Sequence, residues 1–171
     1  RRALDLILDA ADCARQMGHS YVGSAHLLLA LSRCPGMAGH LVRGTGLDEG
    51  LCRAAIGVLQ GVGTPGLPLP QGMTVQLRRI LRCAGKEAKD LGSKYVRPLH
   101  ILLAVLRVEK STAGGIMRLR EVDTQLLFTR TVSYIRTETV QPQKRKKEGA
   151  TMKLLEQFSE DLVQKAASME P

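Results

Sequence analysis

The sequence predicts an all-α protein made of two pseudo-symmetric four-helix repeats, followed by a linker and one further helix. Three observations lead to this prediction. Aromatic residues make up only 3% of the chain, whereas leucine and alanine dominate the apolar 44%, which favours packed helices over sheets. Apolar residues also recur at helical spacing. Finally, one pattern occurs twice along the chain.

The internal repeat is visible at an offset of 74 residues. Nine positions of the first copy reappear unchanged in the second. The identical pairs are Ala10 and Ala84, Ala14 and Ala88, Gly18 and Gly92, Tyr21 and Tyr95, Val22 and Val96, His26 and His100, Leu28 and Leu102, Leu29 and Leu103, and Ala30 and Ala104. After one inserted residue the match continues, with Asp48 answering to Asp123. Residues 1–60 and 73–136 are therefore predicted to be two copies of one unit.

Each unit opens with a predicted amphipathic helix. Its apolar residues follow one another at spacings of 4, 3, 4 and 3, in the series Ala3, Ile7, Ala10, Ala14, Met17 and the series Leu77, Leu81, Ala84, Ala88, Leu91. We expect the helices to end at Gly18 and Gly92, because glycine suits a left-handed C-cap. The Tyr-Val pair that follows each glycine is expected to fold back as a hydrophobic plug against the last turn.

A second helix is predicted to begin near Ser24, a possible N-cap, and near Pro98, which the first turn tolerates. Its body, at 27–31 and 101–106, is apolar on all sides, so it should lie at the centre of its bundle. Two shorter helices should follow in each unit. They are predicted at 37–44 and 48–60, then at 112–119 and 123–136, with Asp48 and Asp123 as caps of the last ones.

Three further segments complete the predicted organisation. Residues 61–72 contain four glycines and three prolines, which is typical of a loop between two four-helix lobes. Residues 137–150 include the basic run 144–147 and are predicted to be a flexible linker, with a nuclear address as the other interpretation of that run. Helical periodicity returns from Met152 to Ala167, so residues 151–171 are predicted to form one further helical element.

The net charge of +9 is concentrated in one part of the chain. Residues 61–136 hold thirteen Lys and Arg against five Asp and Glu, whereas the other parts are nearly balanced. Four of these cations, Arg79, Arg82, Lys86 and Lys89, recur at spacings of 3, 4 and 3 and share one helix face. This basic ridge is either a solvated helix surface or a docking face for an acidic partner.

The sequence predicts no catalytic, cofactor or metal site. It contains no G-x-x-x-x-G-K-[ST] phosphate loop, and its four cysteines lie far apart without a C-x-x-C pair. We expect His26 and His100 to be structural, each imidazole bonding backbone groups near a helix start. His19 and His40 are placed on turn-like segments without a partner.

The expected location is cytoplasmic. No apolar run approaches the length of a transmembrane helix, and no charged-then-apolar leader opens the chain. The cysteines are therefore expected to be reduced thiols. No membrane association is predicted.

The segments 18–31 and 92–106, with their shared Gly-x-x-Tyr-Val and His-x-Leu-Leu-Ala pattern, strongly resemble the Clp N-terminal repeat. Two such repeats in tandem resemble the N-domain of ClpA- and ClpC-type AAA+ unfoldases, and the resemblance covers residues 1–136. Residues 154–162 and 169–171 look like the lead-in to the first ATPase module of those proteins. The chain is therefore expected to end just before that module.

The resemblance implies an eight-helix domain tethered above an ATPase ring. Such a domain receives adaptor and substrate proteins and passes them toward a ClpP-type peptidase. The fragment is expected to be a monomer without a cofactor, and its parent a hexamer that uses ATP and magnesium. In ClpC-like members a glutamate before each repeat's histidine binds phosphoarginine; Ala25 and Leu99 stand there instead, so we expect no phosphoarginine recognition.

Two other function classes were compared with this unfoldase domain. Stand-alone proteins with the double repeat dock on Clp protease rings, but residues 152–171 argue against that assignment. The isoelectric point near 9.8 points to a nucleic-acid binder. The scarcity of aromatic residues for base stacking and the absence of a reader motif argue against it.

Overall fold

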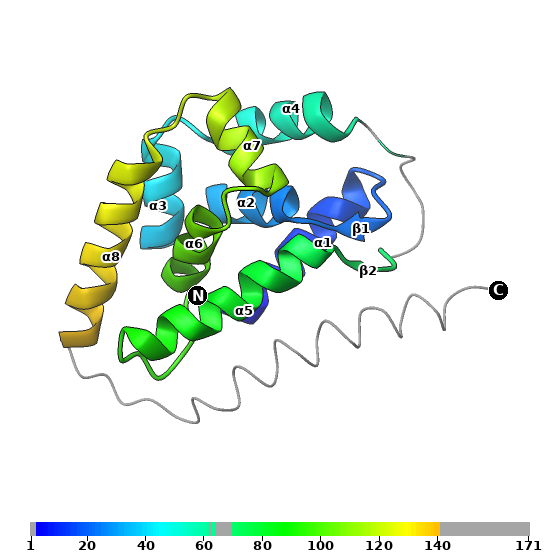
Figure 1. Cartoon of the computed structure of the whole chain (residues 1–171). Coiled ribbons are helices and arrows are strands. Elements are labelled where there is room, and N and C mark those ends of the chain that lie inside the picture. Colours follow the sequence, from blue (N-terminus) through cyan, green and yellow to red (C-terminus); the bar gives the residue numbers. More distant parts are fainter. Residues whose placement is uncertain (1–2, 62, 64–69, 141–171) are drawn as a thin grey trace.

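Two sets of four helices make up the described part of the chain, which in this computed structural model comprises residues 3–61, 63 and 70–140 (Figure 1). The first set is α1 (Ala3–Gln16), α2 (Ser24–Ser32), α3 (Met37–Gly44) and α4 (Glu49–Gln60). The second is α5 (Val75–Asp90), α6 (Pro98–Arg107), α7 (Thr112–Leu119) and α8 (Thr124–Val140). Strands β1 (Tyr21–Val22) and β2 (Gly72–Met73) lie before α2 and α5. The predicted all-α class and the repeat are confirmed.

The predicted local signals for helix ends are also confirmed. Asp48 and Asp123 accept hydrogen bonds from the backbone N–H groups of Leu51 and Leu126, at 2.8 and 3.1 Å, which caps α4 and α8. Gly18 and Gly92 follow α1 and α5 with φ of +72° and +73°. This left-handed conformation is accessible to glycine at little cost, which explains its recurrence at both helix ends.

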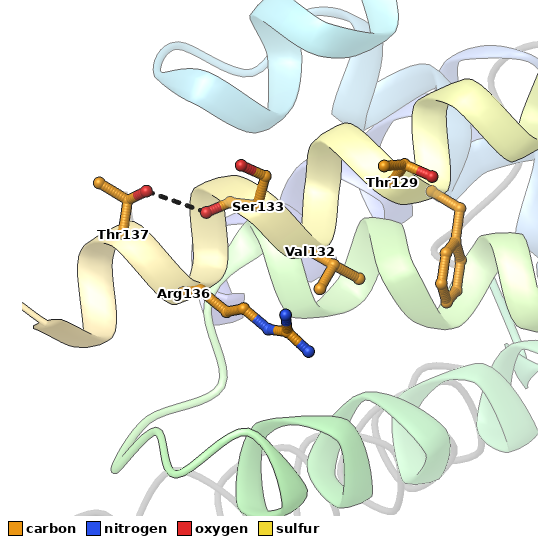
Figure 2. Close-up of a pocket in the computed structure, with 6 residues that line it drawn as sticks. Thr129, Val132, Ser133, Arg136 and Thr137 are labelled. Carbon is orange, nitrogen blue, oxygen red and sulfur yellow. Dashed lines mark hydrogen bonds between the residues drawn. The ribbon is translucent and has the colours of Figure 1, made fainter.

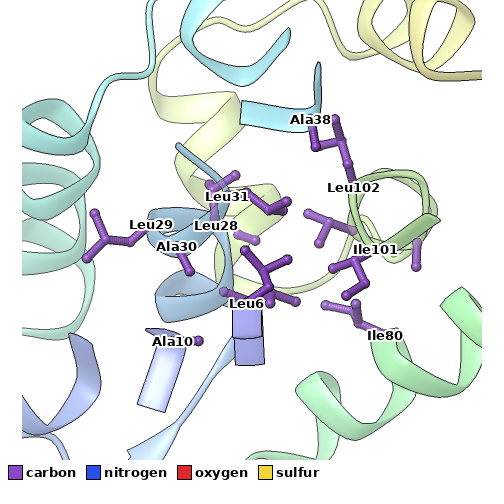
Figure 3. Close-up of a cluster of buried hydrophobic side chains, with 14 of the residues drawn as sticks. Leu6, Ala10, Leu28, Leu29, Ala30, Leu31, Ala38, Ile80, Ile101 and Leu102 are labelled. Atoms are coloured by element: carbon purple, nitrogen blue, oxygen red, sulfur yellow. The ribbon is translucent and has the colours of Figure 1, made fainter. Parts of the chain in front are cut away.

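The core forms where α2 and α6 lie side by side at the centre of the molecule (Figure 1). Every residue of α2 is buried, and so are residues 99–106 of α6. Leu6 of α1, Leu28 of α2 and Ile80 of α5 converge with Ile101 and Leu102 of α6 (Figure 3). The predicted central position of these apolar helices is confirmed. The expectation of two separate lobes is wrong, because both repeats bury their apolar faces in one shared core.

The segments before α2 and α5 form a contact that the sequence pattern did not predict. Tyr21 and Val22 pair in parallel with Gly72 and Met73, so the end of the predicted inter-repeat loop is a short strand. Val22 is fully buried, as a hydrophobic plug should be, whereas Tyr21 is half exposed and donates its hydroxyl to Gln71 at 3.0 Å. The plug is therefore one residue and not the Tyr-Val pair.

Helix α8 continues to Val140, beyond the predicted end at residue 136. Two interactions stabilise the added turn: the Thr137 hydroxyl donates to the Ser133 carbonyl, and Glu138 pairs with Arg97 at 3.0 Å. The predicted linker therefore begins after residue 140. Its remainder at 141–150, and the helical element predicted at 151–171, lie outside the described residues.

Candidate partner-binding surface

The basic ridge lies on the solvent side of α5. Thr74 caps this helix by accepting from the Leu77 N–H at 3.1 Å, and Leu77, Ile80 and Ala84 hold its other side in the core. The four ridge residues, Arg79, Arg82, Lys86 and Lys89, are all exposed. Within the described part of the chain, none of the four forms an ion pair or a hydrogen bond. Their charges are therefore answered by solvent alone and are free to meet an anionic partner.

The positions at which related proteins carry phosphoarginine-binding carboxylates are closed in this structure. Ala25 lies at 0% and Leu99 at 3% exposure, and both side chains belong to the shared core. Neither residue offers a group that could accept a hydrogen bond from a guanidinium. The two positions therefore contribute packing in this chain.

The two repeat histidines cap the helices on which they lie. The Nδ1 of His26 accepts from the Gly23 N–H, and the Nδ1 of His100 accepts from the Arg97 N–H, both at 2.9 Å. This confirms the expected bond to backbone near each helix start. Ser24, which was expected to cap α2, instead accepts from the Ala113 N–H at 2.9 Å and so caps α7 of the other repeat.

His19 has a partner, contrary to expectation. Its Nδ1 lies 2.7 Å from the Nε2 of His26, and its Nε2 lies 2.9 Å from the Gly61 carbonyl oxygen. Because Gly23 donates to His26 Nδ1, His26 carries its proton on Nε2 and donates to His19, which then donates to Gly61. His40 lies within α3 and is exposed, so its predicted turn-like setting is also wrong.

Burial keeps both repeat histidines neutral. Desolvation, aided by His19, lowers the pKa of His26 to about 4. Desolvation, aided by Arg97, lowers the pKa of His100 to about 4. The Nε2 of His100 is buried and has no hydrogen-bond partner, because Ser93 stands at the repeat position of His19 and bonds the Tyr95 carbonyl instead.

The buried thiols and the described acidic groups do not form a recognisable reactive centre. Desolvation raises the pKa of Cys13 and of Cys52 to about 11, so both thiols are protonated at neutral pH. Among the residues the structure describes, no three His, Cys, Asp or Glu side chains gather as metal ligands would. The same residues include no helix that is long and apolar enough to cross a bilayer.

A second surface feature lies along α8 and was missed by the sequence analysis. Two adjoining hollows of about 520 and 490 Å³ share Phe128 and Thr129 in their lining. Val132 and Arg136 lie on one of them, and Leu106 and Arg107 on the other. Val132 and Arg136 both point from α8 to the side on which α5 lies (Figure 2). We call Leu106, Arg107, Phe128, Val132 and Arg136 the α8 groove.

Comparison with known proteins identifies the family. The model for the Clp repeat (R) N-terminal domain matches residues 1–120 and 72–167. A ClpA homolog of Guillardia theta is 27% identical over 168 residues, which are 97% of this chain and 20% of that protein. The chloroplastic chaperone ClpC3 of Oryza sativa subsp. japonica is 33% identical over 107 residues, which are 62% of this chain and 12% of that protein. The chain thus spans a fifth or less of the length of these relatives.

A solved structure supports the fold. The N-terminal domain of the chaperone ClpD from Arabidopsis thaliana superposes with a TM-score of 0.65 at 21% identity, covering 79% of this chain and 95% of that one. The family match extends over both halves of the eight-helix architecture. The chain therefore belongs to the Clp N-terminal repeat domain family, which it shares with ClpA- and ClpC-type chaperone subunits.

Proposed function

We propose that this chain is the receiving domain of an ATP-dependent Clp unfoldase, and that it binds adaptor and substrate proteins before they reach the ATPase ring. The observation that carries the proposal is the basic ridge, a row of exposed cations without partners in the described structure, on a domain of the Clp repeat family. The parent protein would supply ATP and magnesium binding, hexamer formation and contact with a ClpP-type peptidase. The domain itself would perform no catalysis.

The ridge would act mainly on the rate of encounter. Exposed charges are screened within about 8 Å at physiological salt, so they steer an acidic partner more than they stabilise the final complex. An adaptor or an unfolded substrate with an acidic segment fits this surface. The predicted cytoplasmic location stays a prediction, since several relatives are named as chloroplastic proteins.

Charge reversal tests the proposal. We expect Arg82→Glu with Lys86→Glu to slow the association of β-casein, used as an unfolded acidic probe, at least fivefold at low salt in stopped-flow fluorescence. The difference should shrink as salt rises. The control is the reversal of Arg120 and Arg130, which are also exposed but lie outside the ridge. Equal association rates for the wild type and the ridge variant would contradict the proposal.

Phosphoarginine should not be a ligand of this domain. Ala25 and Leu99 supply no carboxylate, and a guanidinium without charge-assisted hydrogen bonds loses about 1.5 to 3 kcal/mol for each bond. Titration calorimetry with free phosphoarginine is expected to show no measurable heat of binding. Micromolar affinity would mean that other carboxylates hold the guanidinium.

A further inference from the structure

The two repeats differ in how they neutralise the arginine at the end of their central helix. Arg33, which follows α2, lies 3.4 Å from Asp9 and 3.3 Å from Glu49. Glu49 also pairs with Arg53 at 3.2 Å, and Arg53 in turn donates to Gln16. In the first repeat, these contacts tie α1, α4 and the end of α2 together, and each arginine is answered by a carboxylate of the chain.

The second repeat has lost most of these counter-charges. Arg107 stands at the repeat position of Arg33, but Cys83 and Thr124 replace Asp9 and Glu49. Phe128 replaces Arg53, and the Arg107 guanidinium lies 4.9 Å from the centre of its ring. The printed ion pair of Arg107 is with Glu87 of α5. An aromatic ring with a cation above it has thus taken the place of an internal salt-bridge network.

The cationic groups around this ring continue in two directions. On α8, Arg136 is exposed and has no ion-pair partner among the described residues. On α5, Lys86 of the ridge is adjacent to Glu87, and both Lys86 and Arg107 act electrostatically on Cys83. Glu109 is the acidic residue in the lining of the hollows. The α8 groove therefore has an apolar floor between two cationic ends and adjoins the basic ridge.

We infer that the α8 groove binds an acidic peptide segment of a partner protein through one large apolar side chain. The apolar side chain would rest against Phe128 and Val132, and flanking carboxylates would approach Arg136 and the ridge. Charge complementarity favours this occupant, because the counter-charges that fill the first repeat are missing here. The inference rests on the proposed function and adds to it the chemical class of the segment.

The test uses the 171-residue chain and three synthetic peptides that are acetylated and amidated. The probe has the sequence EELFEE, the second peptide replaces the central leucine and phenylalanine by serine and glycine, and the third replaces all four glutamates by lysine. Fluorescence anisotropy at low salt gives the affinities, and amide chemical shifts in a titration give the site. We expect EELFEE to bind at least tenfold more tightly than either of the others and to shift residues of α8 and the end of α6.

A matched pair of variants separates the groove from general charge effects. Arg136→Glu should weaken EELFEE binding about tenfold, whereas Arg130→Glu, the same charge change on α8 outside the groove lining, should alter it less than twofold. Absence of EELFEE binding, equal binding of the serine-glycine peptide, or equal effects of the two variants would each overturn the inference. Such a failure leaves the β-casein result unchanged, so loss of the groove and loss of the proposed function are distinguishable.

Discussion

At the scale of single residues, two buried histidines connect the fold to pH. Each accepts a backbone hydrogen bond at Nδ1, a position that protonation would convert into a second donor. The pKa of each is lowered from an ordinary value of 6.5 to about 4. A histidine with a lowered pKa contributes its full stability above pH 6.5, and this contribution is lost as the pH falls toward 4.

We therefore expect His26 and His100 each to reduce the free energy of unfolding by about 2 kcal/mol between pH 7 and pH 5. His100→Asn keeps an acceptor near the Nδ1 position and removes the titration, so the variant should lose less stability over this range than the wild type. Urea denaturation at the two pH values measures the difference. His40→Asn serves as the control because His40 is exposed; if it gave the same change as His100→Asn, burial would not be the cause.

Two neighbouring glycines of α7 have opposite roles. A Cβ on Gly114 would lie 2.1 Å from the carbonyl oxygen of Glu109, whereas a Cβ on Gly115 would meet nothing closer than Leu59 at 3.7 Å. We expect Gly114→Ala to destabilise the domain by more than about 2 kcal/mol and Gly115→Ala to be neutral or to stabilise it by up to about 1 kcal/mol. Thermal denaturation of the two variants provides the comparison. Similar values for both would contradict the close backbone approach.

At the scale of helices, the last turn of α8 depends on the other end of the same repeat. The Arg97–Glu138 pair joins the start of α6 to this turn across 41 residues of sequence. Because both side chains are partly exposed, the pair should contribute less than about 1 kcal/mol to global stability. Its main effect should therefore be local ordering of the helix end.

We expect Glu138→Gln to increase amide hydrogen exchange at residues 137–140 while the exchange of α6 and the overall melting temperature change little. Arg130→Gln, which alters an exposed residue of α8 without an ion pair in the described structure, is the control. Exchange followed by NMR resolves the individual amides. Unchanged protection in Glu138→Gln would show that the backbone alone holds the last turn.

At the scale of the whole molecule, the single core predicts one folding unit. Leu28 and Ile101 come from different repeats, and both are fully buried in the same cluster. Leu28→Ala and Ile101→Ala should each lower the free energy of unfolding by about 2 to 5 kcal/mol. Each should also shift one common thermal transition rather than separate two.

Circular dichroism and hydrogen exchange of both repeats follow this transition. Added magnesium-ATP should not change the melting temperature, because a ligand stabilises a protein only by binding its folded state. Two separate transitions, or loss of protection in one repeat alone, would mean that the repeats fold independently.

Local features of this protein could be read directly from its sequence. The caps at Asp48 and Asp123, the glycines after α1 and α5, and the histidine bonds at the helix starts all join residues within a few positions of one another. The all-round apolar composition of α2 and α6 similarly places both in the core, because no side of either helix tolerates water. The exposure of the basic ridge follows from the same helical spacing.

Contacts between distant segments were decided by tertiary structure alone. The pairing of β1 with β2, the cap that Ser24 provides to α7, the His19–His26 bond and the added turn of α8 each depend on how the helices are packed. The α8 groove belongs to this group, since Arg107 and Phe128 meet only when α6 and α8 are side by side. Spacing along a helix specifies which face a residue occupies, but packing of the two repeats determines what that face meets.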